Sequence, residues 1–309
     1  MISKFIHIIA FLPVVFATSK ALSCGQGLSM SIGNTPYNFA SGGAPTIPVT
    51  VTRNSGGGSN NSCSFFIVID NGATGTSCTT RRLTLGQEPY PIQFYSDPAH
   101  RTYVIKPFGP GLSTTDVVSG QFNSPGLSPA IVNFYPFLDT SLYLPSGQYS
   151  EMYSISLYMG APGNAVLQQT LNVNFSYTNG KKADLSFVET GAVFNMNRAH
   201  QDYNFGELVT GAQKAFDLIL KYNSGYQISM KSLHSNRLFN SSTNTFISYN
   251  LNLNGQPFAL TDDYQVVQAS VGTSSANGLR LPVSVAIGSV SGAKPGKYTD
   301  TIMISVLSN

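Results

Sequence analysis

The residue types that most often do chemistry in proteins are few in this chain and lie far apart. After the first histidine, the remaining ones are His100, His200 and His234, and none stands in a His-x-x-x-His or His-Glu-x-x-His pattern that would hold a metal ion. No Gly-x-Ser-x-Gly segment supplies a nucleophile. No two carboxylates are spaced as an acid–base pair. We therefore predict a non-enzymatic protein with no catalytic residue, no metal site and no cofactor.

The cysteines suggest a structural role instead. Cys63 and Cys78 stand on either side of the Asp70-Asn71 turn, each seven residues away from it. Two paired strands leaving that turn would bring the cysteines within disulfide reach. We therefore predict a Cys63–Cys78 bridge, which leaves Cys24 over.

The composition excludes several classes of protein. Charged residues make up 10% of the 309, against about 25% in an average soluble domain. With 42% hydrophobic residues, 16 Tyr and 19 Phe, the chain has ample material for a core, so it is not disordered. A net charge of +3 is too small for the basic surface of a nucleic-acid binder. The length suits two domains of about 150 residues.

The first residues have the features of a secretory signal. A basic start at Lys4 is followed by a mostly apolar run over residues 5–17, which is too short to span a bilayer as a helix. Small residues follow at cleavage positions after Ser19 or Ala21. We predict a signal peptide at residues 1–21 and no membrane span in the mature chain. A lipid anchor on Cys24 is a second interpretation, although Ala21 stands where a lipoprotein usually has Leu.

The rest of the chain has the pattern of β-strands. Residues 47–52 and 171–177 alternate apolar and polar side chains, which places every second side chain on one face of a sheet. Residues 65–69 form an apolar strand that ends at the turn Asp70-Asn71-Gly72. Short strands separated by Gly, Pro and Asn turns predict an all-β fold of the sandwich or barrel type.

An internal repeat divides the mature chain in two. Residues 147–157 match residues 296–306, and Tyr37-Asn38-Phe39 matches Tyr203-Asn204-Phe205 in the same order. We predict an N-terminal domain at residues 22–178 and a C-terminal domain at residues 183–309, joined by a polar hinge.

The two halves end differently. The first half continues past its repeat into a further alternating strand over residues 166–177, whereas the second stops at Asn309. The C-terminal domain is therefore predicted to be an incomplete sandwich that lacks its last strand. Such a domain exposes an apolar groove that a strand from another chain can fill. We expect alternate residues of its final strand, Ile302, Ile304 and Val306, to line that donor-strand acceptor groove, although the same residues would also suit a closed core.

Short motifs are similar to those of a known family. Three segments resemble the spore coat protein U domain family: Arg-Arg-Leu-Thr at residues 81–84, Ile-Gln-Phe-Tyr-Ser-Asp-Pro-Ala-His-Arg at residues 92–101, and the closing segments that begin Pro-Ser-Gly-Gln-Tyr at Pro145 and Pro-Gly-Lys-Tyr at Pro295. Phe205-Gly206 with Leu208 adds a further match. The resemblance spans nearly all of the mature chain.

The resemblance implies two immunoglobulin-like β-sandwich domains in tandem, the second of pilin type. Family members include subunits of archaic chaperone–usher pili, and a two-domain member with an incomplete second domain resembles a tip adhesin. The implied partners are a periplasmic pilus chaperone, an usher, an adjacent pilin subunit and a host or abiotic surface. The implied location is the pilus tip at the cell surface, reached through the periplasm. A self-assembling secreted coat protein is the alternative.

Three further expectations depend on this resemblance. Little chain separates the predicted cleavage site from the first strand at residues 28–32, so we expect the subunit to accept a donor strand but not to give one. The family ties an early strand to a later one, which makes Cys24–Cys63 the rival disulfide. The family also keeps one Arg at Arg81-Arg82, which favours a structural Arg over an anion site.

Two apolar segments are the candidates for binding a surface. They are residues 107–112 and 134–144, which we place between strands, where exposed apolar side chains usually mark interaction sites. In the alternative interpretation, residues 134–144 close one end of the sandwich as core. The predicted surface-binding residues are Phe108, Leu112, Phe137, Leu138 and Leu142.

Overall fold

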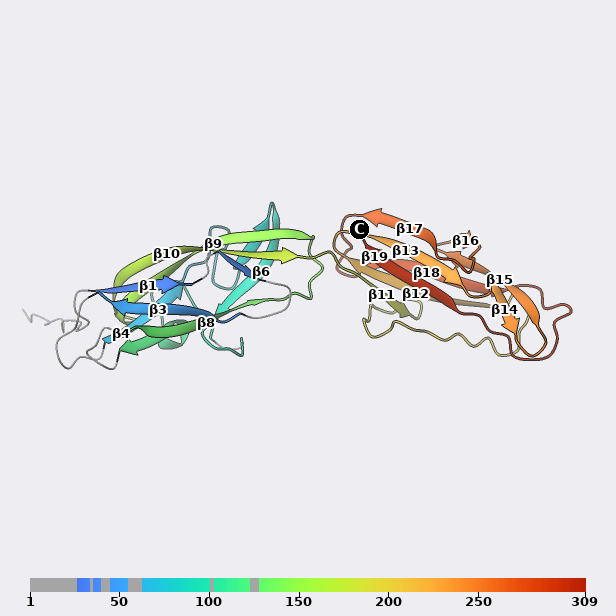
Figure 1. The fold of residues 1–309 in the computed structure, drawn as a ribbon, viewed down its shortest axis with the longest axis horizontal. Helices are drawn as coiled ribbons and strands as arrows, with labels where there is room; N and C mark the ends of the chain where they lie inside the picture. The colour runs from blue at the N-terminus through green and yellow to red at the C-terminus, as the bar shows by residue number, and fades with distance from the viewer. Residues whose placement is uncertain (1–26, 34–35, 40–44, 55–62, 101–102, 123–127) are drawn as a thin grey trace, which may run out of the picture.

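A computed structural model describes residues 27–33, 36–39, 45–54, 63–100, 103–122 and 128–309. The predicted signal peptide and Cys24 lie outside the described residues. Within the described residues, every regular element is a β-strand except the single 3₁₀ turn η1 (Thr114–Asp116). The predicted all-β class is confirmed, as two sandwich domains in line (Figure 1).

The N-terminal domain contains ten of the described strands around one hydrophobic core. They are β1 (Leu28–Ile32), β2 (Tyr37–Phe39), β3 (Ile47–Arg53), β4 (Cys63–Ile69), β5 (Arg82–Leu85), β6 (Glu88–Tyr95), β7 (Val118–Phe122), β8 (Ala130–Leu138), β9 (Gly147–Ala161) and β10 (Asn164–Asn179).

These strands pack as two layers. One layer has the order β1-β3-β8-β6-β5 and the other has the order β7-β4-β9-β10-β2. In the second layer β10 lies between two neighbours, antiparallel to β9 and parallel to the short β2. The layers meet through aromatic rings, because Phe94 of β6 contacts Tyr153 of β9 and Phe175 of β10 at 5.0 and 5.1 Å between ring centroids. This is the face-to-face packing of an immunoglobulin-like sandwich.

The C-terminal domain contains nine described strands around a second core. They are β11 (Ala183–Val188), β12 (Gln213–Tyr222), β13 (Gly225–Ser232), β14 (Arg237–Asn240), β15 (Thr245–Leu253), β16 (Gln256–Phe258), β17 (Gln265–Val271), β18 (Leu279–Ile287) and β19 (Ile302–Ser308).

The two domains share a strand order, but the second is smaller. The order β11-β12-β18-β15-β14 repeats that of β1-β3-β8-β6-β5, and β17-β13-β19 repeats β7-β4-β9. β10 and β2 have no counterpart among the described strands of the C-terminal domain. Among the described residues, the second sandwich therefore has no strand equivalent to the one that follows β9 in the first.

The predicted repeat is visible in the local geometry at the start of β9 and of the segment before β19. Gly147 and Gly296 have φ angles of 147° and 145°, a region that favours glycine. The hydroxyl groups of Tyr149 and Tyr298 each donate to the carbonyl oxygen four residues upstream, at 2.8 and 2.9 Å. Residues 147–157 and 296–306 are thus structural equivalents.

Two expectations about local structure were wrong. Residues 134–144 do not lie wholly between strands, because Phe134–Leu138 belong to β8 in the middle of a sheet. The segments that flank the Asp70 turn also fail to form a hairpin. β4 pairs with β7 and β9, whereas β5 pairs with β6 and β9.

Asn223 joins the two domains. Its side chain accepts a hydrogen bond from the Lys182 amide at 2.7 Å and donates to the Gly180 carbonyl at 2.8 Å. Its backbone accepts from the Ser146 amide and donates to the Lys182 carbonyl. Because Asn223 is 1% exposed, both its side chain and its backbone hold the linker in place without competition from water.

Phe175 of β10 provides a test of this packing. The Phe175→Ala variant should lower the free energy of unfolding of the N-terminal domain by about 3–5 kcal/mol, because the fully buried ring contacts rings from both layers. Val166→Ala, on the same strand but 47% exposed, should change it by less than about 0.5 kcal/mol. Denaturant titration measures both variants, and equal effects would contradict the assigned core.

Candidate functional site

The last strand, β19, lies at the edge of its sheet. It pairs antiparallel with β13 on one side, and none of the described strands pairs with its other side. Its side chains Ile302, Ile304 and Val306 pack against the core but remain only partly buried. An edge strand with incompletely covered apolar side chains is a place where another strand can add.

The equivalent strand in the N-terminal domain shows what is missing. Tyr153, Ile155 and Leu157 of β9 correspond to the three β19 residues, and each is 0% exposed. The difference is β10, which pairs along the other side of β9 and inserts Val173 and Phe175 into the core. Completion by one strand therefore converts a partly exposed row into a fully buried one.

A second row of apolar residues faces this edge from the other sheet. Ala183, Leu185 and Phe187 of β11 are also partly buried and pack against the same core. β11 and β19 come into contact between the two sheets. The open edge, defined by these three residues together with Ile302, Ile304 and Val306, thus receives apolar side chains from both layers. The sequence prediction missed the β11 row, although its alternation is visible in residues 183–187.

Tyr203, which packs against the same core, has a hydroxyl group without a hydrogen-bond partner among the described residues. Its ring stacks on Phe216 of β12, with 4.8 Å between centroids. Burial raises the pKa of the hydroxyl group to about 12. Tyr37, its match in the sequence repeat, instead begins the short strand β2, which pairs with β10.

Asp300 holds the chain just ahead of β19. Its carboxylate accepts hydrogen bonds from the Ser232 and Tyr249 hydroxyl groups, both at 2.6 Å, and from the ring and amide nitrogens of His234 at 3.1 Å. Burial and the bond to Asp300 raise the pKa of Tyr249. The cluster joins the end of β13 and the segment ahead of β19 to β15 of the other sheet, so His234 has a structural role here.

Phe108 and Leu112 lie on the outer face of the β4–β9–β10 layer. Phe108 is 50% exposed, and its ring stacks on that of Tyr158 at 4.3 Å between centroids. Leu112 is half-buried against the same cluster. The Lys106–Asp116 ion pair, at 2.8 Å, closes the loop that carries both residues, and the bond to Lys106 lowers the pKa of Asp116 to about 2.

The structure adds a residue to this patch. Leu167 of β10 is 53% exposed and lies opposite Tyr158 in the sheet register, so the two side chains share one face. We call Phe108, Leu112, Tyr158 and Leu167 the outer aromatic patch. Its strand members lie too far from residues 107–112 in the sequence for any local pattern to associate them.

The other predicted surface residues lie elsewhere. Phe137 is 42% exposed on the outer face of β8, with its ring 5.7 Å from that of His100. Leu138 is 8% exposed and belongs to the core, so its assignment to a binding loop was wrong. Leu142 packs partly against the core and lines the junction between the domains. The five residues therefore do not form one surface.

The predicted disulfide is also wrong. Cys63 is disulfide-bonded, but Cys78 is a free thiol. The reason is that Cys63 begins β4 and pairs with Phe122 of β7, while Cys78 sits in a turn outside any strand. The rival pairing of Cys63 with Cys24 has one partner outside the described residues.

Arg81 is structural, as favoured by the sequence interpretation. The side chain is 2% exposed and donates to the carbonyl oxygens of Asp70 and Ile105, both at 2.7 Å, and to that of Ile69 at 2.5 Å. Burial lowers its pKa to about 10. All its donors point to the protein's own backbone or to Gln93, so the guanidinium does not face an anion site.

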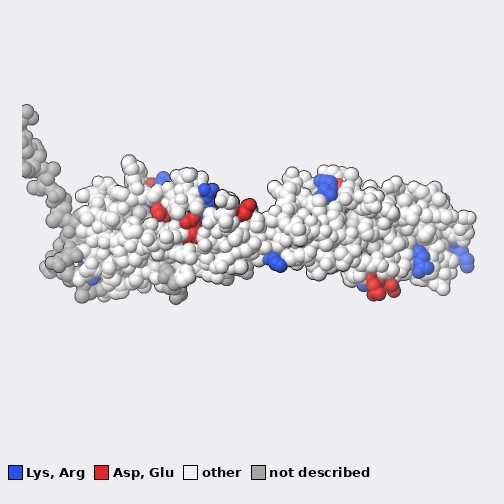
Figure 2. Space-filling view, turned by 90° about the horizontal axis from the view of Figure 1, so that it is seen from above, with Lys and Arg blue, Asp and Glu red and all other residues white. Residues whose placement is uncertain are grey.

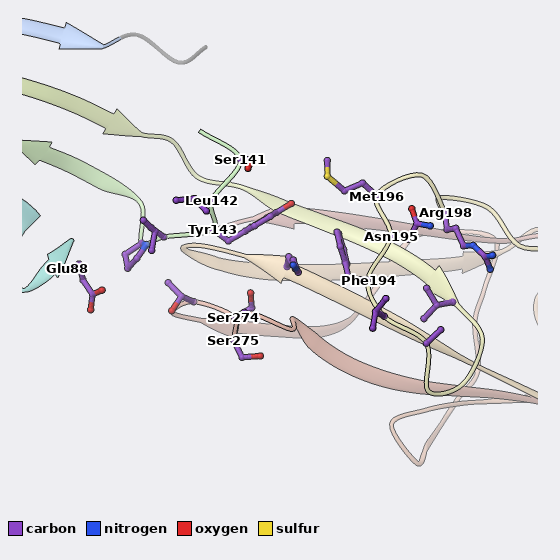
Figure 3. A pocket seen from close by; sticks show the side chains of 18 of the residues that line it. Glu88, Ser141, Leu142, Tyr143, Phe194, Asn195, Met196, Arg198, Ser274 and Ser275 are labelled. Atoms are coloured by element: carbon purple, nitrogen blue, oxygen red, sulfur yellow. The ribbon is translucent and has the colours of Figure 1, made fainter. Parts of the chain in front are cut away.

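A cavity of about 1050 Å³ lies at the junction between the domains (Figure 3). Lys221 extends between two of its rings, with Nζ 5.8 Å from the Tyr143 centroid and 5.1 Å from the Phe194 centroid. Tyr143 also donates a hydrogen bond to Asp184 of the other domain. The Lys221–Tyr143 cation–π contact and the Tyr143–Asp184 hydrogen bond therefore join the two domains, whereas Phe194 belongs to the same domain as Lys221.

Charge and metal ligands are sparse on this molecule. Figure 2 shows few, scattered charged side chains on the face that it presents. Within the described residues, no three His, Cys, Asp or Glu side chains gather where they could hold a metal ion. The same part of the chain contains no helix that is long and apolar enough to cross a bilayer.

The thiol assignment can be tested directly. Iodoacetamide added to the unfolded, unreduced chain should modify Cys78, whereas Cys63 should be modified only after reduction. Peptide mapping by mass spectrometry locates the label. Recovery of a peptide pair that joins Cys63 to Cys78 would contradict the structure.

Comparison with known proteins gives structural likenesses only. No protein-family model matches the chain, and no curated protein matches it. One similar solved structure is the CsuC–CsuE complex of a chaperone and a tip adhesion subunit from archaic chaperone–usher Csu pili of Acinetobacter baumannii. It has 13% identity and a TM-score of 0.44, over 92% of this chain and 93% of that chain. Another is CfaE, the adhesive subunit of CFA/I fimbriae of enterotoxigenic Escherichia coli. It has 13% identity and a TM-score of 0.30, over 93% and 83% of the two chains.

Proposed function

We propose that this protein is a non-enzymatic adhesin subunit at the tip of a chaperone–usher pilus. The C-terminal domain takes up a strand from a partner, first a periplasmic chaperone and then, at the usher, the adjacent pilin subunit. The observation that carries the proposal is the open edge, where Ile302, Ile304 and Val306 are partly exposed while their equivalents under β10 are fully buried. Exported through the periplasm, the subunit would act at the cell surface.

The direction of β19 supports a terminal position for the N-terminal domain. β19 ends beside the domain junction, where the Asn309 amide donates to the Gly225 carbonyl (Figure 1). A partner strand that runs antiparallel to β19, as β10 runs to β9, ends at the opposite end of the C-terminal domain. The rest of the partner would then extend the rod away from the N-terminal domain.

The outer aromatic patch is the proposed binding surface. It belongs to the complete, N-terminal sandwich, and it presents Phe108 and Leu167 half-exposed on one face. Large exposed apolar side chains gathered in one place mark interaction sites on soluble proteins. We propose that this patch attaches to apolar host or abiotic surfaces.

Strand uptake can be tested at Ile304. In the Ile304→Asp variant, the amount of co-expressed pilus chaperone that co-purifies with the protein should fall by tenfold or more. The reason is that the added strand would bury an unpaired charge, which is costly in free energy. Met303→Asp provides the matched control, because Met303 is the neighbouring residue with its side chain on the opposite face, 38% exposed. It should retain the complex.

Ile304→Ser is a milder change at the same position. The unfolding transition of the N-terminal domain should be unaltered in both Ile304 variants, which separates loss of strand uptake from general misfolding. Full chaperone binding by Ile304→Asp would refute the assignment of the open edge.

The binding surface can be tested with a double variant. Replacing Phe108 and Leu167 by Ser should reduce attachment of the purified protein to polystyrene by tenfold or more, because burying the exposed half of each apolar side chain contributes on the order of 1 kcal/mol. Both residues are half-exposed, so stability should change little. The control Ile131→Ser removes a 64% exposed apolar side chain from β8 in the other layer and should leave attachment intact. Equal losses in both proteins would count against the patch.

A further inference from the structure

We propose that the partner strand carries a C-terminal recognition sequence, aromatic-x-Tyr-x-Asn, beyond the alternating apolar residues that fill the open edge. This inference rests on the proposed strand uptake. Its template is β10, because β10 completes the equivalent sandwich in the same chain and ends in Phe175-Ser176-Tyr177-Thr178-Asn179.

The strand register transfers this template to the C-terminal domain. In the N-terminal domain, Leu171 and Val173 lie opposite Ile155 and Tyr153, whose equivalents are Ile304 and Ile302. Going on along β10, the three inward residues Phe175, Tyr177 and Asn179 lie opposite positions equivalent to Asp300, Tyr298 and Gly296. The partner strand therefore extends beyond β19 over the segment that precedes it.

Exposure shows that this preceding segment is also uncovered. Tyr149 is fully buried, whereas its equivalent Tyr298 is only half-buried. Gly147 is half-buried, whereas Gly296 is exposed. The segment ahead of β19 is thus uncovered at Tyr298 and Gly296, whereas the Asp300 side chain is 3% exposed. Apolar contacts with β19 alone would leave these two positions open.

The asparagine has a specific task in the template. Asn179 is 1% exposed, and its amide nitrogen donates to the carbonyl oxygens of Leu144 and Pro145 at 2.7 and 3.1 Å. Its side-chain oxygen accepts from the Tyr177 hydroxyl group at 3.4 Å. By the equivalence of Tyr149 and Tyr298, the matching carbonyl groups in the C-terminal domain are those of Ala293 and Lys294, which are exposed residues.

The aromatic position of the recognition sequence, Phe175 in the template, also has aromatic neighbours. Phe175 lies 5.8 and 5.9 Å from the rings of Tyr37 and Phe39 in β2, which flanks β10. In the C-terminal domain the matching residue Tyr203 is turned onto Phe216, and its hydroxyl group is buried without a partner among the described residues. An aromatic side chain from the partner strand would restore the stacking that Phe175 gives to Tyr37.

The test uses a fluorescein-labelled synthetic peptide with the sequence of residues 169–180 of this chain, titrated into the full-length mature protein by fluorescence anisotropy. The parent peptide should bind and should fail to bind the Ile304→Asp protein. Peptide variants Asn179→Ala and Phe175→Ala should each bind at least tenfold more weakly, since each loses a buried interaction of the template. The matched control is Asn174→Ala, because Asn174 of β10 is exposed, and it should bind as the parent does.

The outcomes separate this inference from the function on which it rests. Equal binding of the parent, Asn179→Ala and Phe175→Ala peptides would overturn the recognition sequence while leaving strand uptake intact. A twelve-residue peptide of alternating Val and Thr that binds as tightly as the parent would overturn it too. Failure of all these peptides to bind, with the chaperone complex still dependent on Ile304, would also contradict β10 as a template. Failure of the peptides together with an Ile304-independent chaperone complex would overturn the uptake itself.

Discussion

The architecture depends on one constraint: β9 and its equivalent β19 each need a neighbouring strand on both sides. In the N-terminal domain β10 supplies that neighbour, and Ile155 and Leu157 are sealed from water. In the C-terminal domain the equivalent residues Ile304 and Val306 remain partly open. Backbone groups and apolar side chains left in this state favour the addition of a strand from another molecule.

The junction between the domains sets the direction of the open edge relative to the complete domain. Asn223 holds the linker, and Lys221 lies between the rings of Tyr143 and Phe194 from the two domains. The complete domain is thereby held at one end of a rod (Figure 1), and the open edge runs toward the other. In the proposed function, a load applied to the outer aromatic patch would pass through this junction into the strand taken up from the partner.

Sequence predicted the parts of this account that depend on local pattern. Alternation and the repeat of residues 147–157 in 296–306 predicted the sandwiches and the absent strand. The Cys63–Cys78 bridge failed because spacing around a turn does not determine strand pairing, and β4 pairs with β7 and β9 instead. The assignment of Leu138 to a binding loop was wrong because a short apolar run has the same composition in a loop as in a buried strand. The pairing of Phe108 with Tyr158 arises from tertiary contact, which no local pattern encodes.

Amide hydrogen exchange of the isolated protein tests the central claim most directly. The equivalent strands β9 and β19 provide an internal comparison under identical conditions. We predict that amides of residues 302–308 exchange much faster than those of residues 153–159, and that they slow when the chaperone binds. Equal protection of the two strands in the isolated chain would contradict the open edge and, with it, the proposed mode of assembly.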